Sequence, residues 1–140
     1  MIEETFATFR SCGENLRECQ LYWLSNWDDP FNLTEIAHPR HMSSSHSLAI
    51  ESGWISTFWS DLASRGLGVR AQVHTHPCEA FHSPTDDAYP LLGDAGFLSL
   101  VIPDFAMGPV GFCNAYLTEI QPDGRWRRVE FGGRIRIDGD

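Results

Sequence analysis

The residues best suited to chemistry are two histidines and an aspartate in the middle of the chain. His74 and His76 are separated by one residue, and Asp86 follows after a short spacer. On an extended segment the two imidazoles point to the same side, because side chains alternate along a strand. Two nitrogens, one carboxylate oxygen and an open fourth position are typical of a hydrolytic zinc site, whereas a structural site is closed by four protein ligands. The pattern predicts one zinc ion per chain, bound by His74, His76 and Asp86.

The segment that carries the aspartate has a second explanation. Ser83 followed by Pro84 is typical of a helix start, with serine as the N-cap and proline at the first helical position. Capping requires no metal, but the two roles are compatible, because a helix start would hold Asp86 rigidly. Asp87 is a rival ligand.

Together these pieces resemble the motif of the JAB/MPN metalloprotease family, the JAMM motif, in which a glutamate precedes His-x-His and Ser-x-x-Asp. Here the string is His74-Thr75-His76-Pro77, a spacer from Cys78 to His82, and Ser83-Pro84-Thr85-Asp86. The proline after the second histidine also belongs to the family pattern. Asp86 is preferred over Asp87 because it keeps Ser-x-x-Asp intact.

The resemblance implies two further catalytic residues. Glu18, directly before the apolar run Cys19–Leu24, best matches the glutamate that takes a proton from the metal-bound water and returns it to the leaving amine. Ser83 would donate a hydrogen bond to the oxyanion of the tetrahedral intermediate. Leu21 and Tyr22 depart from the small residues common in the family after this glutamate. The alternative bases are, in order, Glu14, Glu35 and Glu51.

Enzymes of this family are similar in cutting amide bonds at the C-terminal glycine of ubiquitin or a ubiquitin-like protein. Short bacterial members are encoded beside a ubiquitin-like protein and its activating and conjugating enzymes, some of them in antiphage defence. The resemblance therefore implies a zinc-dependent isopeptidase or processing protease whose partners are a ubiquitin-like protein and its conjugates. A metallohydrolase of small thioester, sulfur-carrier or cysteine-conjugate substrates and an inactive scaffold remain as alternatives.

Composition sets outer bounds on the function. A chain of 140 residues with 42% hydrophobic residues predicts a single domain over residues 1–140. The net charge of −9 argues against nucleic acid as a partner, even though five arginines crowd the C-terminus. A solvated strand face is the favoured explanation for those arginines. No apolar stretch suits a membrane span and the acidic N-terminus does not resemble a signal peptide, so we expect no membrane contact and a cytoplasmic location.

The remaining cysteines and histidines form no compact ligand pattern in the sequence. Cys12, Cys19, Cys78 and Cys113 contain no C-x-x-C pair, and free thiols are expected. Cys78, two residues after His76, could intrude on the metal, but a packing role beside the site is the favoured explanation. His82 is expected to line the mouth of the site. For His38, His41 and His46, surface or capping roles are expected.

Hydrophobic periodicity and turn signals predict helices and strands that alternate, followed by a late hairpin. The expected fold is therefore a mixed α/β domain with helices packed on a sheet. The resemblance implies a curved mixed sheet flanked by helices, with cytidine-deaminase-like layering. The expected elements are helices over Phe6–Cys12, Trp54–Leu62 and from Ser83, strands over Cys19–Leu24, Thr34–Pro39, Val69–His74 and Phe97–Ile102, a turn over Asn26–Asn32, a polar loop over Arg40–His46, and a hairpin of Gly111–Ile120 with Arg125–Phe131.

Overall fold

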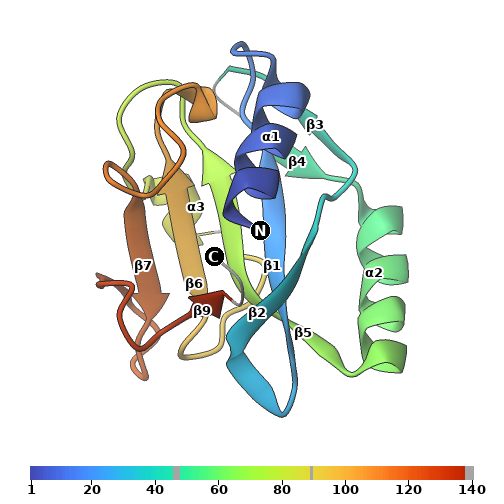
Figure 1. Ribbon diagram of the computed structural model, residues 1–140. Helices are drawn as coiled ribbons and strands as arrows, with labels where there is room; N and C mark the ends of the chain where they lie inside the picture. Colours follow the sequence, from blue (N-terminus) through green and yellow to red (C-terminus); the bar gives the residue numbers. More distant parts are fainter. Residues whose placement is uncertain (46–47, 89, 138–140) are drawn as a thin grey trace.

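Seven strands form one mixed, twisted sheet at the centre of the molecule (Figure 1). In this computed structural model, residues 1–45, 48–88 and 90–137 are described. The strands are β1 (Gln20–Asn26), β2 (Asp29–Ala37), β5 (Leu67–Thr75), β6 (Leu98–Ile102), β7 (Tyr116–Ile120), β8 (Trp126–Arg128) and β9 (Arg136–Ile137). They follow the order β8-β7-β6-β5-β1-β2-β9, in which β5–β6 and β2–β9 are parallel pairs and the other neighbours are antiparallel.

Two apolar clusters cover the two faces of this sheet. Helix α1 (Ile2–Gly13) lies across the front face in Figure 1, where its phenylalanines pack with Leu21 and Trp23 of β1. Helix α2 (Ser52–Arg65) packs with Tyr22 and Leu24 on the opposite face. The alternating side chains of β1 are therefore buried on both sides, which explains why this strand is a continuous apolar run in the sequence.

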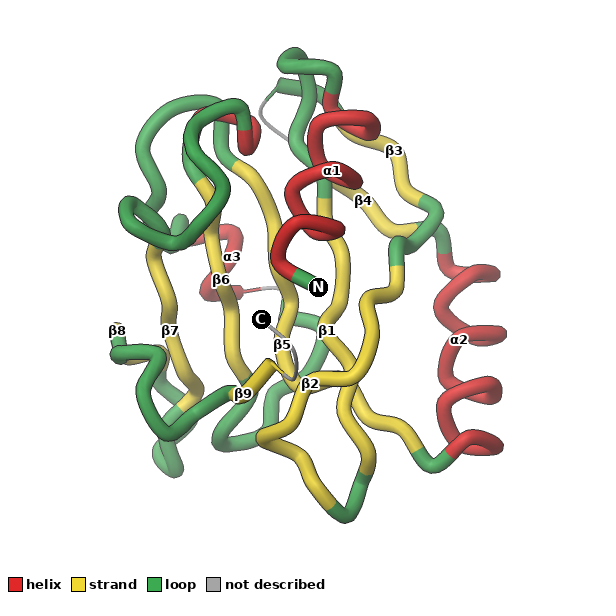
Figure 2. The backbone as a smooth tube through the Cα atoms, viewed as in Figure 1, coloured by secondary structure: helices red, strands yellow, loops and turns green. Residues whose placement is uncertain are grey.

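The helix and strand predictions are confirmed for most of the chain. Gly66 caps the C-terminus of α2. It adopts the left-handed conformation that glycine takes most readily, and its amide donates a hydrogen bond to the Leu62 carbonyl. The predicted C-terminal hairpin is present as β7 and β8, with strands shorter than expected. Helix α3 (Pro84–Ala88) begins after Ser83 and lies behind the sheet, as Figure 2 shows. No helix in the described part of the chain is both long and apolar enough to cross a membrane.

Two local predictions are wrong. The turn expected over residues 26–32 is tighter, because β2 already begins at Asp29 and pairs with β1 from there. The loop expected over residues 40–46 contains strand β3 (His41–Ser43), which pairs with β4 (Leu48–Ile50) in a separate two-stranded sheet. Backbone hydrogen bonds make this hairpin, so the serine-rich composition did not reveal it. His46 lies outside the described residues.

The buried face of β6 allows a test of the core. Leu100 is fully buried in the cluster beneath α1, so Leu100→Ala should lower the free energy of unfolding by about 2–5 kcal/mol. Leu16 is 65% exposed, and Leu16→Ala should change stability by less than about 0.5 kcal/mol. Urea unfolding of both variants measures the difference. Equal losses of unfolding free energy in the two variants would contradict the burial of Leu100 in the core.

Candidate metal centre

Strand β5 delivers two histidines to one end of the sheet. His74 lies in the strand and His76 one residue beyond its end, where the His76 amide still donates to the Ile102 carbonyl at 3.0 Å. Both side chains are buried, and Thr75 between them points to the other face, where its hydroxyl accepts a hydrogen bond from the Cys19 amide. The alternation expected from His-x-His is therefore present in the structure.

Asp86 is held against these rings by the start of α3. Its Oδ2 accepts a hydrogen bond from the Ser83 amide at 2.9 Å, and its own amide donates to the Ser83 hydroxyl oxygen at 3.1 Å. This reciprocal pair is a capping box with aspartate in the third position, so the predicted N-cap is confirmed. The carboxylate oxygens lie 3.2 Å from Nε2 of His74 and 3.4 Å from Nε2 of His76.

These separations fit a tetrahedral zinc ion. Zn–N and Zn–O bonds of about 2.0–2.2 Å place neighbouring ligand atoms about 3.3–3.5 Å apart in a tetrahedron. Both ring nitrogens of His74 are buried, and neither makes a well-aligned hydrogen bond among the described residues, although Nε2 lies 3.2 Å from the Asp86 carboxylate. Buried polar atoms without a partner are rare in proteins. A metal ion bonded to His74 would satisfy one of them.

The charge of Asp86 also suits this role. Burial raises the pKa of its carboxyl, but the contacts with His74 and His76 outweigh burial and hold the pKa well below its usual range. The group is therefore a carboxylate at any pH at which the histidines can be neutral ligands.

A cavity of about 450 Å³ opens beside the three candidate ligands. Glu18 and Ser83 both line it, together with His74, His76 and Asp86. Gln20 pairs with His74 across the β1–β5 ladder, and the Thr75 amide donates to the Cys19 carbonyl. Glu18, one residue before Cys19, therefore lies opposite His76 and on the same face of the sheet. The structure thus brings all five predicted site residues together.

The rival carboxylates lie elsewhere. Glu14 caps the end of α1 and is 4.0 Å from Arg17, Glu35 pairs with Arg65, and Glu51 is 3.9 Å from Arg40. None of them lines the cavity. Asp87 contacts Nδ1 of His82 at 2.5 Å instead of the two ligand histidines.

Two neighbours of the motif differ in position. Cys78 is exposed and lines the cavity, as its place in the sequence suggested. The expected place of His82 at the mouth is wrong: its ring packs on Trp126 and is not part of the lining. Burial lowers the pKa of His82, although the hydrogen bond to Asp87 opposes this effect. Its contribution is to hold the loop before α3.

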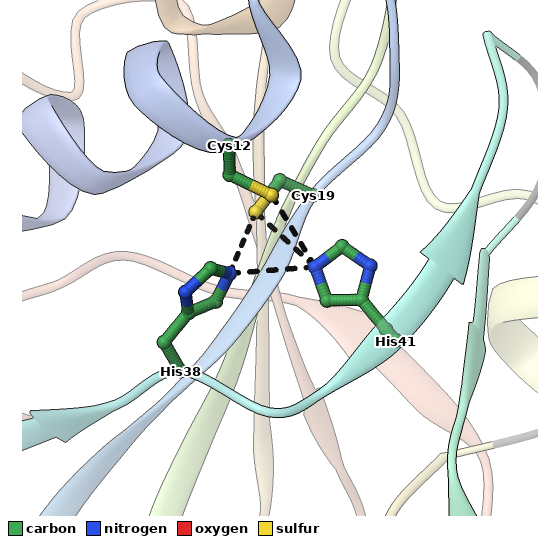
Figure 3. Close-up of side chains that lie close together, drawn as sticks. All are labelled: Cys12, Cys19, His38 and His41. Atoms are coloured by element: carbon green, nitrogen blue, oxygen red, sulfur yellow. Dashed lines mark hydrogen bonds between the residues drawn. The ribbon is translucent and has the colours of Figure 1, made fainter.

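A second group of potential metal ligands was missed by the sequence analysis. Cys12, Cys19, His38 and His41 converge on the face of the sheet that α1 covers (Figure 3). The only signal in the sequence is the His-x-x-His spacing of the two histidines. The two cysteines lie far from them along the chain, which is why no compact pattern is visible.

The ligands of the first site and one relative of the chain support a metal-dependent hydrolase. The chain is 34% identical over 130 residues to the probable metalloprotease y4jG of Sinorhizobium fredii, a match that covers 88% of this chain and 79% of that protein. The chain therefore belongs to the metalloprotease family of that relative. No protein-family model matches the chain. The solution structure of protein DSY2949 from Desulfitobacterium hafniense has a similar fold, with a TM-score of 0.65 at 18% identity over 99% of this chain and 88% of that one.

The ligand assignment leads to a direct measurement of metal content. His74→Ala and Asp86→Ala should each lower the bound zinc by about one ion per chain, because two remaining ligands do not hold the metal tightly. Asp87→Ala is the matched control, since its carboxylate contacts His82, and it should retain the wild-type amount. Elemental analysis of dialysed protein provides the reading. Loss of zinc in Asp87→Ala with retention in Asp86→Ala would move the ligand by one residue.

Proposed function

We propose that this protein is a zinc-dependent isopeptidase of the JAB/MPN type, which cleaves after the C-terminal glycine of a ubiquitin-like protein. The observation that carries the proposal is the meeting of Glu18 and Ser83 with the three ligands around one cavity. A metal site that only stabilised the fold would need neither an acid beside it nor an open cavity.

The residues around the cavity divide the work of amide hydrolysis. When bound, zinc supplies Lewis acidity and activates water at neutral pH. Glu18 takes the proton of the attacking water and returns it to the departing amine, and its place opposite His76 supports this role. Ser83 donates a hydrogen bond from its hydroxyl group to the oxyanion, because its oxygen already accepts a hydrogen bond from the Asp86 amide and its O–H remains available.

The surroundings of the cavity favour an extended, glycine-ended substrate. Leu48, the first residue of β4, lines the cavity. Among the described strands β4 pairs only with β3, so its other edge can receive an added strand. Glycine has no side chain to clash as its backbone approaches the metal. Phe81, 46% exposed and packed on the His76 ring, offers apolar contact to the body of the substrate.

A fusion substrate tests the specificity. The ubiquitin-like protein encoded nearest to this gene, joined through its terminal glycine to a reporter, should be cut directly after that glycine, as read by mass spectrometry. Replacing the glycine by leucine should slow the reaction by at least about 100-fold, because the side chain blocks close approach to the metal. A chelator should stop it. Cutting that is indifferent to this residue, or that continues without metal, would refute the proposed substrate class.

The base can be tested with the same fusion. Glu18→Gln keeps the shape of the side chain but accepts no proton, so the turnover rate should fall by about 10²–10⁴-fold. Zinc content and the thermal unfolding temperature should stay unchanged. Glu14→Gln, at the exposed end of α1, is the matched control and should cut at the wild-type rate. Wild-type turnover in Glu18→Gln would remove Glu18 from the mechanism.

A further inference from the structure

Four side chains from separate segments meet beneath the end of α1. Cys12 lies in the last turn of α1, Cys19 directly before β1, His38 directly after β2, and His41 at the start of β3. Figure 3 shows both sulfurs and both Nε2 atoms directed toward one point. The four atoms all lie within 4.8 Å of one another.

The individual distances match a zinc coordination shell. The two Nε2 atoms are 3.3 Å apart. The sulfur–nitrogen distances are 3.3 Å for Cys12–His41, 3.3 Å for Cys19–His38 and 3.5 Å for Cys19–His41. Zn–N bonds of about 2.05 Å and Zn–S bonds of about 2.3 Å give tetrahedral edges of about 3.3 Å between nitrogens and about 3.6 Å between nitrogen and sulfur. Each contact agrees with these edges to within a few tenths of an ångström.

Hydrogen bonding alone explains this arrangement poorly. A thiol is a weak donor, and a neutral imidazole has one donor and one acceptor nitrogen. In this cluster Nε2 of His41 is near Cys12, Cys19 and Nε2 of His38 at once. One ring nitrogen makes one good hydrogen bond, as donor or as acceptor. A cation at the centre accepts all four lone pairs together.

The site is reachable from solvent and separate from the catalytic cavity. His38 is exposed, and both histidines line an open groove of about 690 Å³ with Cys12. Cys19 belongs to the core cluster beneath α1, whereas Glu18 lines the cavity on the other face. Neighbouring residues on an extended chain point to opposite faces. Cys19 of the second ligand set and the proposed base Glu18 are therefore adjacent in the chain but face opposite sides of the sheet.

We propose that Cys12, Cys19, His38 and His41 bind a second zinc ion, in a structural site closed by four protein ligands. This ion joins α1 to the segment before β1 and to the connection between β2 and β3. Through Cys19 it also fixes the backbone next to Glu18. The site would thus hold the general base in place from the opposite face of the sheet, without contact with substrate.

Cobalt substitution distinguishes this site from the catalytic one. The full chain carrying His74→Ala and His76→Ala, stripped of metal under reducing conditions, should bind about one Co²⁺ per chain in tetrahedral geometry. Its absorption spectrum should show a thiolate-to-cobalt charge-transfer band in the near ultraviolet, which a site of histidines and a carboxylate cannot produce. Zinc should displace the cobalt and raise the thermal unfolding temperature. No enzymatic activity is involved, so the outcome does not depend on the proposed substrate.

Variants in the same background identify the ligands. Cys12→Ser with Cys19→Ser should abolish the band, whereas Cys113→Ser, an exposed thiol elsewhere, should retain it. His38→Ala removes an exposed side chain and should leave the fold intact by circular dichroism. Loss of a residue that only orients a metal ligand weakens metal binding by about 10–100-fold. His38→Ala removes a ligand itself, so it should weaken zinc binding by more than this. A chain that binds no cobalt after loss of His74 and His76, or unchanged affinity in His38→Ala, would overturn the proposal. So would a Cys12–Cys19 disulfide in protein purified under reducing conditions.

Discussion

The antiparallel pairing of β1 with β5 is the constraint on which the rest of this molecule depends. The register places Gln20 opposite His74 and, by continuation, Glu18 opposite His76. A shift by one residue would turn every side chain of β1 to the other face of the sheet. Glu18 would then lie beneath α1 and Cys19 in the cavity. Such a shift would exchange Trp23, which packs beneath α1, with Tyr22, which packs against α2, and the close packing of both clusters opposes that exchange.

The same burial determines the chemistry at the end of the sheet. His74 and His76 are only 5% and 6% exposed, so their rings have lost most of their hydration. Polar groups in such surroundings require partners. Asp86 supplies part of the compensation from α3, and the short helix can do so because Ser83 fixes its first turn. A metal ion bound between the two rings would give the buried imidazoles the partner that the carboxylate supplies only in part.

The two candidate metal sites differ in the way that catalytic and structural zinc sites usually differ. The site of His74, His76 and Asp86 has three ligands and adjoins a cavity with an acid and a hydroxyl group. The cluster of two cysteines and two histidines offers four ligands and no vacant position. Cys19 and His38 flank the paired strands β1 and β2, whereas Cys12 belongs to α1 and His41 to β3. A cross-link there would restrict the motion of α1 and β3 relative to the sheet. In the proposed mechanism, the second site would act on catalysis through the backbone of residues 18 and 19.

The sequence alone determined the elements whose signals are local. The capping residues around Ser83, the glycine that ends α2 and the apolar runs of β1 and β6 follow from short-range preferences, and their predictions are confirmed. His-x-His followed by Ser-x-x-Asp is also local, so it was visible before the fold was known. The sequence preferred Glu18 over the other glutamates only through the resemblance. Its position at the cavity depends on a strand register between distant segments, which only the tertiary structure shows. The cluster of Cys12, Cys19, His38 and His41 is hidden for the same reason. Its four members lie in four segments. The pairing of β1 with β2 brings Cys19 close to His38, and the packing of α1 on the sheet adds Cys12.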